Sequence, residues 1–316
     1  MQRNLSIDLL KFGLAILVVA IHTGFLGDVS QQLCYILISG IFRIAVPIFF
    51  VINGYYFAKV LSSPSAWLKR GLILYLVWML IYSYYWFNPS GINAYSLLKI
   101  VKTLLVGYEH LWYIASMLGA AVLLYYLRNL SSTLLLVLAV VFYIAGTMFQ
   151  YLGNYHVFKG SSLDVFFNTL WIYRSPVLFA FPFFCIGYLI AKYQVQQKIK
   201  PLYLAIGVGV GLILVASESY INFTSMVKRE GFDMLFSLLL VCPLVFMLFL
   251  GFNVPGKSKN IAFYSTAIYL VHFLIIIQLK ALTELHHSIL TLAAIVISLA
   301  VSFVLVMINQ RVKYLL

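Results

Sequence analysis

Three ionisable side chains lie in the first apolar run of the chain: Asp8, Lys11 and His22. They are 3 and 11 residues apart, so in an α-helix of about 100° per residue they fall within a stripe roughly 60° wide. An ionisable group inside a membrane costs at least about 2.5 kcal/mol and faces a bundle interior, a cavity or another such group. This stripe therefore predicts a polar site inside the protein.

His22, near the C-terminal end of this helix, is the candidate general base. An imidazole titrates near neutral pH and can take a proton from an acceptor hydroxyl. Asp8 and Lys11 lie about 21 and 16 Å from it along the helix axis, so we expect them to line the cavity or to pair with each other at i, i+3. The alternative for His22 is an interfacial histidine that bonds to a neighbouring helix.

Arg43 lies deep inside the second apolar run, where its guanidinium cannot easily reach the interface. This group stays protonated in proteins, so it needs an anionic partner. One interpretation is a structural ion pair with an acid such as Asp28 or Glu109. The other is a clamp on an anionic group or on an oxyanion that develops during a reaction. Pro47 frees a backbone carbonyl nearby.

Glu109 and His110 open the fourth apolar run, next to Trp112 and Tyr113. The aromatic pair is typical of a membrane interface. An anchor of that kind does not explain the adjacent Glu-His pair, which we expect at the same end of the bundle as His22. Glu109 also lies near a helix N-terminus, where an anion is favoured.

Other polar residues fall at both ends of the predicted bundle. Lys69 and Arg70 precede the third run, where they either set topology or contact phosphates of a cytoplasmic donor. His272 is a second imidazole inside an apolar run, and Arg174 lies in the longest outer loop, residues 153–176. We expect Arg174 near the outer end of the site.

The composition places these residues in a membrane. Of 316 residues, 64% are apolar and 9% charged, with a mean hydropathy of +1.02, whereas soluble domains are about half apolar and a quarter charged. The apolar runs have the length of helices that cross about 30 Å of hydrocarbon. We predict an all-α integral membrane protein, a bundle of about ten spans: Leu5–Leu26, Leu33–Ala58, Leu72–Phe87, Leu111–Leu127, Leu134–Leu152, Val177–Ala191, Leu202–Ile221, Met234–Phe252, Ile261–Leu282 and Ile289–Ile308.

The charge pattern favours a cytoplasmic location for both termini. With that orientation, 13 of the 21 Lys and Arg residues and one of the eight acids lie on the inner side, as the positive-inside rule expects. The net charge of +13 then follows from topology, and no nucleic-acid partner is expected. Three scattered cysteines predict neither a disulfide framework nor a metal site. We expect one transmembrane domain over residues 1–316, without a soluble appendage.

Four segments, in order, resemble motifs of the acyltransferase-3 family of membrane acyltransferases. The first motif of that family is a basic residue, ten further residues and a histidine, and Lys11 and His22 have this spacing. Residues 43–55 are similar to its R-x-x-V-P-x-F-F-x-x-S-G-Y stretch, residues 110–113 to its H-L-W-Y/F element, and residues 265–272 to its S-x-x-I-Y-x-x-H element. The resemblance covers essentially the whole chain, and ten membrane helices also fit the family.

The resemblance implies transfer of an acyl group, usually acetyl, from cytoplasmic acyl-coenzyme A to a sugar hydroxyl of lipopolysaccharide, capsule, peptidoglycan or a lipid-linked glycan. It implies a multi-pass protein of the bacterial inner membrane, with acetyl-coenzyme A as co-substrate and membrane lipids as partners. Lys11 stands where many members have Arg, and Asn53 where Ser is common. Bidentate contacts by a guanidinium are therefore not expected at Lys11.

These expectations assign the site residues as follows. His22 activates the acceptor hydroxyl, and Arg43 or His110 stabilises the tetrahedral oxyanion beside Glu109. Lys11, Lys69 and Arg70 contact the donor. Further polar support is expected from Asp8, Asn53, Arg174 and His272.

Two other functions fit the same buried charges. A transporter would use them as a pathway for a small solute, although the chain shows no obvious matching pair of interrupted helices. Coenzyme A binding separates this function from acyl transfer. A scaffold in a glycan-assembly complex leaves Asp8, Lys11 and Arg43 without a role and ranks third.

Overall fold

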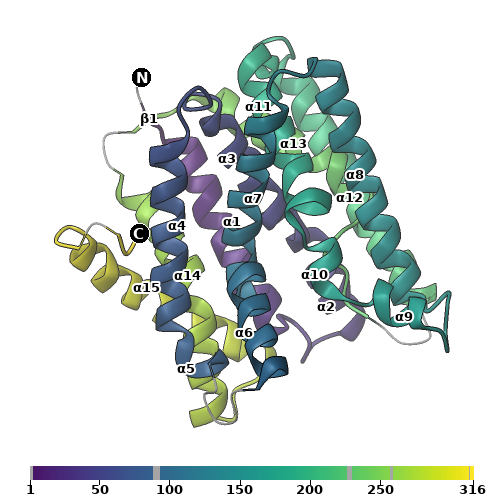
Figure 1. Ribbon diagram of the computed structural model, residues 1–316, viewed down its shortest axis with the longest axis vertical. Coiled ribbons are helices and arrows are strands. Elements are labelled where there is room, and N and C mark those ends of the chain that lie inside the picture. The colour runs from purple at the N-terminus through teal and green to yellow at the C-terminus, as the bar shows by residue number, and fades with distance from the viewer. Residues whose placement is uncertain (1–2, 88–92, 226–229, 257–258, 313) are drawn as a thin grey trace.

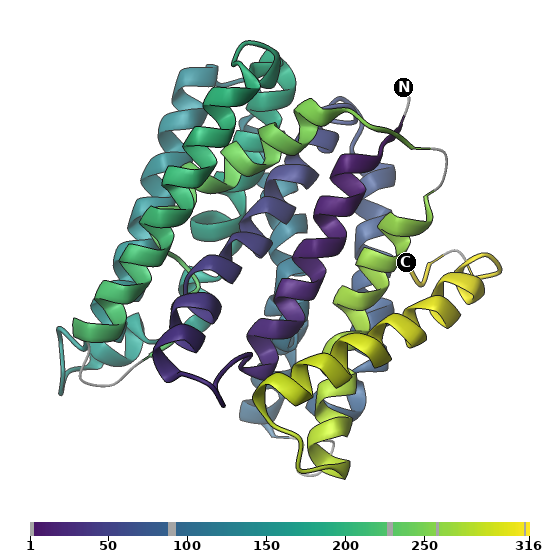
Figure 2. The same cartoon turned by 180° about the vertical axis from the view of Figure 1, so that it is seen from behind.

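The chain is a bundle of helices, seen from opposite sides in Figures 1 and 2. The computed structural model describes residues 3–87, 93–225, 230–256, 259–312 and 314–316. Two short antiparallel strands, β1 (Arg3–Asn4) and β2 (Pro255–Gly256), tie the N-terminus to the loop before α14. The helices are α1 (Leu5–Thr23), α2 (Gln31–Ile38), η1 (Ile41–Ile44), α3 (Ala45–Phe57), α4 (Ser65–Ile81), α5 (Ser83–Trp86), α6 (Ala94–Val106), η2 (Glu109–Leu111), α7 (Trp112–Leu127), α8 (Ser132–Asn154), α9 (Ser162–Phe167), α10 (Leu170–Tyr173), η3 (Pro176–Ala180), α11 (Phe181–Tyr193), η4 (Val195–Gln197), α12 (Pro201–Ser225), α13 (Leu238–Phe252), α14 (Asn260–Leu282) and α15 (His287–Asn309).

The all-helical membrane class is confirmed. In the described part of the chain, eight helices are long and apolar enough to cross a membrane. The other two predicted spans correspond to α4, which has 17 residues, and α13, which has 15. A count of ten spans and the orientation of the termini therefore stay predictions. Lys257 and Lys313, which contribute to the predicted charge pattern, lie outside the described residues.

Three predicted boundaries differ from the structure for local reasons. The first helix ends at Thr23 because Gly24 adopts a left-handed backbone conformation, so His22 lies in its last turn. Helix α4 begins seven residues before the predicted Leu72, because the stretch with Lys69 and Arg70 is helical although it is not apolar. Helix α13 begins at Leu238 instead of Met234, because the preceding residues form a buried loop.

The second predicted span is not one continuous α-helix. It consists of α2, the 3₁₀ turn η1 and α3. Helix α2 ends at Ile38, and a Cβ on Gly40 would lie 2.2 Å from the carbonyl oxygen of Ile36 and 2.7 Å from Ser219 Cβ. Pro47 supplies no N–H for the carbonyl of Arg43. The break therefore occurs where glycine allows close contact with α12 and proline prevents regular bonding.

Helices α3 and α11 pack backbone against backbone. A Cβ on Gly54 would lie 1.8 Å from the carbonyl oxygen of Phe184, and one on Gly187 would lie 2.0 Å from that of Val51. Glycines at such positions allow close approach of membrane helices. This contact fixes α3 and, with it, the turn that carries Arg43.

Helices α1, α3, α7 and α14 surround the central part of the bundle, with α1 packed on α14 and on α3. Figure 2 shows α15, in yellow, crossing obliquely in front of α14, unlike the steeper neighbouring helices. The long outer loop predicted at residues 153–176 is partly helical, with α9 and α10 packed on α8. An additional amphipathic helix, α6, precedes α7.

Candidate active site

A small cavity at the C-terminal end of α1 has a volume of about 60 Å³, and five of the predicted site residues line it. Its polar wall consists of His22, Arg43, Glu109, His110, Arg174 and Asp233. These residues come from α1, η1, η2 and the segments before η3 and α13. The fold therefore brings together side chains that are up to 211 residues apart in the sequence (22 to 233).

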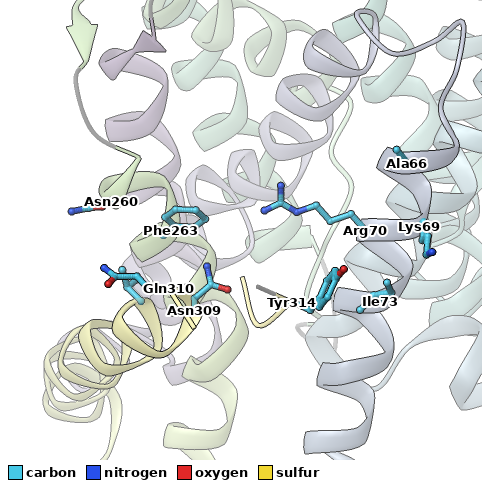
Figure 3. A pocket seen from close by; sticks show the side chains of 10 residues that line it. Ala66, Lys69, Arg70, Ile73, Asn260, Phe263, Asn309, Gln310 and Tyr314 are labelled. Atoms are coloured by element: carbon cyan, nitrogen blue, oxygen red, sulfur yellow. The ribbon is translucent and has the colours of Figure 1, made fainter. Parts of the chain in front are cut away.

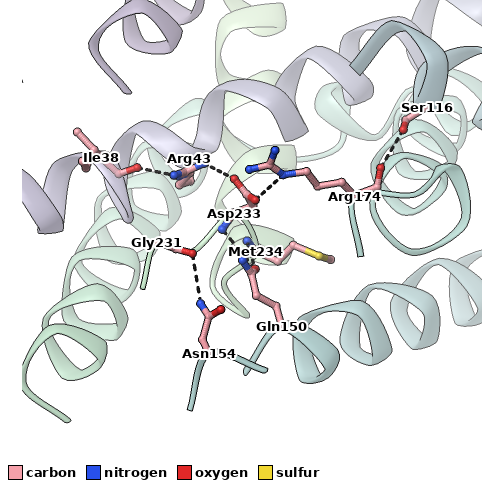
Figure 4. Close-up of polar contacts among 9 residues, drawn as sticks. All are labelled: Ile38, Arg43, Ser116, Gln150, Asn154, Arg174, Gly231, Asp233 and Met234. Carbon is pink, nitrogen blue, oxygen red and sulfur yellow. Dashed lines mark hydrogen bonds and ion pairs between the residues drawn. The ribbon is translucent and has the colours of Figure 1, made fainter. Parts of the chain in front are cut away.

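Asp233 bridges two arginines in this cavity, as Figure 4 shows. Its Oδ1 accepts from Nη1 of Arg43, and its Oδ2 accepts from Nε of Arg174 at 2.6 Å. Arg43 thus has an acidic partner, as one interpretation expected, but the two acids suggested for it, Asp28 and Glu109, are wrong. Asp28 accepts from the Ser288 hydroxyl at 2.6 Å in a loop, and Glu109 is exposed at the cavity rim.

The break in the second span is part of this site. Arg43 Nε donates to the carbonyl oxygen of Ile38 at 2.7 Å, so it satisfies a carbonyl at the C-terminal end of α2. A cation is favoured at this end of a helix. On the other side, η3 is a π-helical turn whose Phe179 lines the cavity; such turns often occur at functional sites. Two irregular helices therefore meet at the same cavity.

Asp233 is held by a loop that folds into the protein. Oε1 of Gln150 accepts from the backbone N–H groups of Met234 (2.8 Å) and Asp233 (3.3 Å). The hydroxyl of Tyr143 donates to the carbonyl oxygen of Leu235 at 2.7 Å. Met234 and Leu235 are fully buried. Helix α8 thus fixes the backbone that presents the carboxylate.

Glu218 of α12 secures the other end of this loop. Its carboxylate accepts from the backbone N–H of Phe236 at 2.8 Å, the N–H of Ser237 at 2.9 Å and the hydroxyl of Ser237 at 2.5 Å. The hydroxyl of Tyr151 also donates to it at 2.6 Å. The N-terminus of α13 is therefore capped by an acidic side chain from a neighbouring helix.

The charges keep Asp233 ionised. Burial alone would raise its pKa, but the guanidinium groups of Arg174 and Arg43 hold the pKa below its ordinary value. Two cations and one anion leave the Arg43–Asp233–Arg174 cluster with a surplus positive charge. Arg174 also stacks over the ring of Trp112, 5.5 Å from its centroid. An anionic group or a developing oxyanion is the chemistry that such a cluster stabilises.

Three imidazole rings meet beside this cluster. The ring centroids of His22 and His272 are 5.3 Å apart, and those of His110 and His272 are 4.8 Å apart. His272 Nδ1 lies 2.7 Å from the carbonyl oxygen of Tyr269, which requires a proton on Nδ1 and leaves Nε2 as an acceptor. Among the described residues, His272 Nε2 and both ring nitrogens of His110 are buried without a hydrogen-bond partner. Because such groups are costly to bury unpaired, they indicate a site that takes a polar ligand.

A second cavity, of about 160 Å³, lies nearer the N-terminal end of α1 and is lined by Lys11 and Asn53. Nδ2 of Asn53 donates to the hydroxyl of Tyr113 at 2.7 Å and to the carbonyl oxygen of Phe49 at 2.8 Å. The Lys11 amine lies 5.8 Å from the ring centroid of Tyr56. Asn53, a predicted supporting residue, and Lys11, a predicted donor contact, therefore line a different cavity from His22. Asp8 is buried one turn before Lys11.

The largest of the three cavities, about 610 Å³, contains two of the three predicted donor contacts (Figure 3). Lys69 and Arg70 of α4 line one side, and Asn260 and Phe263 of α14 line the other, with the end of α15 between them. Arg70 Nη2 donates to the carbonyl oxygen of Leu316 at 3.3 Å. Sequence reasoning placed these two basic residues away from the histidines, and the structure does the same.

Sequence reasoning missed Asp233. The signal available was a lone acid directly before an apolar run and an arginine inside a span that needed a partner. The same description fits other acids at the outer ends of spans, and only the folded loop selects among them. Within the described residues no cluster of three potential ligands could hold a metal ion.

Comparisons with known proteins connect this chain to one family. A family model described as an acyltransferase domain matches residues 4–307. An amino-acid racemase of Enterococcus faecalis is 28% identical over 99% of this chain and 47% of its own length. A serine/alanine racemase of Enterococcus gallinarum is 25% identical over 86% of this chain and 40% of its own length. The chain thus spans less than half of these curated relatives. No solved structure matches it.

Proposed function

The chain belongs to the acyltransferase-3 family, and from this premise we propose that it transfers an acyl group, in the simplest case acetyl, from acyl-coenzyme A to a hydroxyl of a surface polysaccharide or lipid-linked glycan. The proposed location is the bacterial inner membrane, with both termini in the cytoplasm. In that orientation the large cavity at Lys69 and Arg70 faces the cytoplasm, and the cavity at His22 lies toward the outside.

The observation that carries this proposal is the order of the three cavities along the bundle. Ile73 of α4 lines the large cavity and its neighbour Leu74 lines the middle one. On α1, Lys11 lines the middle cavity and His22 the small one, about 16 Å further along the helix axis. A donor with a charged nucleotide end and a long flexible arm that ends in a thioester fits this order.

Each end of the series suits one end of the donor. Lys69 and Arg70 offer positive charge to the phosphates of coenzyme A. The middle cavity, lined mainly by apolar and hydroxyl-bearing side chains with Lys11, would take the uncharged arm. The thioester would then reach the small cavity, where His22 and the Arg43–Asp233–Arg174 cluster lie together.

The chemistry follows from those groups. His22 takes the proton of the acceptor hydroxyl as its oxygen attacks the thioester carbonyl. The tetrahedral oxyanion forms beside Arg43 and Arg174, whose surplus positive charge stabilises it. The carbon–sulfur bond then breaks, and the thiolate takes the proton from His22, which yields coenzyme A and the ester. In this scheme His272 and His110 are positioning residues, because the ring of His272 packs on the base and that of His110 packs on His272.

A second candidate function is transport of a small amino acid. The interrupted α2–η1–α3 segment and the π turn η3 meet at a cavity with both acidic and basic side chains, as in transporters whose broken helices bind substrate. The relatives named racemases act, by their names, on amino acids. A transporter of this kind does not require coenzyme A, so donor binding decides between the two functions.

The test is binding and turnover of radiolabelled acetyl-coenzyme A by the purified protein in lipid nanodiscs. We expect saturable binding and slow hydrolysis by the wild type, because water can replace the acceptor. His22→Ala should retain binding and lose turnover by about 100-fold or more. The matched control is His286→Ala, since His286 is exposed in a loop outside these three cavities.

Each other outcome has a defined meaning. Full turnover in His22→Ala would show that His22 is not the base. No binding of acetyl-coenzyme A by well-folded wild type would contradict the acyltransferase proposal. Uptake of a labelled amino acid by proteoliposomes in that case would support transport.

A further inference from the structure

A fourth hollow lies on one side of the bundle. It has a volume of about 400 Å³ and lies between the end of α6 and the α9–α10 region, with α7 beneath it. Its wall is mainly apolar, and three of its residues are largely uncovered by protein: Leu105 (73% exposed), Phe166 (47%) and Trp171 (45%). We call this hollow the lateral groove. Its exposed apolar rim suits hydrocarbon and not water.

The lateral groove ends at a residue of the candidate active site. Arg174 lines both the groove and the small cavity with His22. The carbonyl oxygen of Arg174 accepts from the hydroxyl of Ser116 at 3.0 Å, which fixes its backbone against α7. A molecule in the groove therefore has one end beside Arg174, whose guanidinium contacts Asp233.

Helix α6 extends the apolar surface and adds a charge. Leu98, Val101 and Leu105 are spaced 3 and 4 residues apart and are 68%, 44% and 73% exposed, so they form one stripe on α6. Lys102, on the same helix, lies over the ring of Trp171 at 5.4 Å from its centroid. The groove thus combines a surface for a hydrocarbon chain with two cations, Lys102 and Arg174.

We propose that the lateral groove binds the acceptor as a membrane lipid, whose chain lies along α6 and whose phosphate lies between Lys102 and Arg174, with the sugar to be acylated beyond it. This inference rests on the proposed acyl transfer and narrows its acceptor to a lipid-linked glycan. A free polysaccharide needs neither an apolar wall nor an opening toward lipid. The charge complementarity favours an anionic headgroup over a neutral one.

The test uses a photoactivatable polyprenyl monophosphate with a diazirine in its chain, added to the protein in zwitterionic nanodiscs. We expect crosslinks in residues 98–116 and 166–172. Lys102→Glu should weaken labelling by about 30-fold, since each charge near the lipid surface contributes about 1 kcal/mol and this variant changes the charge by two. A neutral polyprenol probe should label more weakly and should not respond to Lys102→Glu.

Blocking the groove provides a second measurement. Ala115→Trp and Ile172→Trp each fill it from a different element, and both should abolish specific labelling. The matched control is Val141→Trp on α8, a lipid-facing position that is 52% exposed and does not line the groove. Two filling variants and one surface charge variant keep the test valid if one of them misfolds.

The outcomes separate this inference from the proposed function. Labelling spread evenly over the lipid-facing helices, or equal competition by phosphatidylglycerol, would overturn the groove proposal, because ordinary surrounding lipid then explains the contact. Unchanged labelling in both filling variants would overturn it too. Acetyl-coenzyme A binding is measured on the same preparations. Absence of donor binding with intact groove labelling would contradict the proposed acyl transfer but not lipid binding in the groove.

Discussion

At the scale of single residues, the site depends on how Arg43 is neutralised. A buried guanidinium without an anion is strongly unfavourable, and Asp233 supplies that anion while it also contacts Arg174. One carboxylate shared by two guanidiniums leaves the cluster positive. Arg43 is therefore held in place and still able to attract further negative charge, which a simple one-to-one ion pair would not allow.

We predict that Asp233→Asn lowers stability by about 3 kcal/mol, because two partly buried cations then face each other without an anion. The two guanidiniums lower the pKa of Asp233, so its contribution is complete above the ordinary carboxyl pKa of about 3.9 and is lost as the pH falls through the lower folded-state value. The apparent Tm of wild type and variant in detergent should differ at pH 7 and converge as the pH falls through the lowered pKa of Asp233.

Asp28→Asn is the control for this prediction. Asp28 is another acid with a lowered pKa, due first to its bond with the Ser288 hydroxyl, but it lies in a loop and contacts no arginine in the described structure. Its replacement should shift the apparent Tm little at any pH. A loss as large as that of Asp233→Asn would show that the arginine cluster is not the source of the stability.

The residues of the site were predictable to different degrees. His22, Arg43 and His110 lie in segments whose motifs can be read in the sequence, and the fold brings them together. Asp233 lies in a loop whose position depends on Gln150 and Glu218, two helix residues far away in the sequence. The position of this loop depends on hydrogen bonds between residues that are distant in the sequence. The local pattern of apolar and polar residues does not predict such bonds.

At the scale of elements, apolar length predicted where helices lie but not where they break. The second span contains enough apolar residues to cross a membrane, yet Gly40 and Pro47 divide it into α2, η1 and α3. Hydropathy carries no information on a 3₁₀ or π turn, because these differ in backbone bonding and not in side-chain polarity. The breaks matter because they position Arg43 and Phe179 in the cavity.

We predict that the α3–α11 contact is the least tolerant helix contact near the site. Gly187→Ala would place a Cβ 2.0 Å from the carbonyl oxygen of Val51, which forces the helices apart at a cost of about 3 kcal/mol. Gly209→Ala on α12 meets nothing within 4 Å and should be neutral or slightly stabilising. The measurement is the apparent Tm of each variant in detergent, compared with that of the wild type. Equal values would contradict a backbone contact between α3 and α11.

At the scale of the whole molecule, the proposed function requires that the two ends of the bundle face different compartments. Lys69 and Arg70 line the large cavity toward one end of α4, whereas His22 is in the last turn of α1 at the other end of the bundle. Coenzyme A is a cytoplasmic donor in this scheme, and a surface glycan is an outer acceptor. Composition establishes membrane insertion, but orientation follows only from the distribution of Lys and Arg.

We predict that Lys198→Cys, in the loop between α11 and α12, reacts with a membrane-impermeant maleimide only after spheroplasts are permeabilised. Lys159→Cys, in the loop between α8 and α9, should react before permeabilisation. Both positions are exposed, and the three native cysteines are buried, so background labelling should be low. The reverse pattern would place the large cavity outside, where it could not meet a cytoplasmic thioester, and acyl transfer from coenzyme A by the proposed route would be wrong.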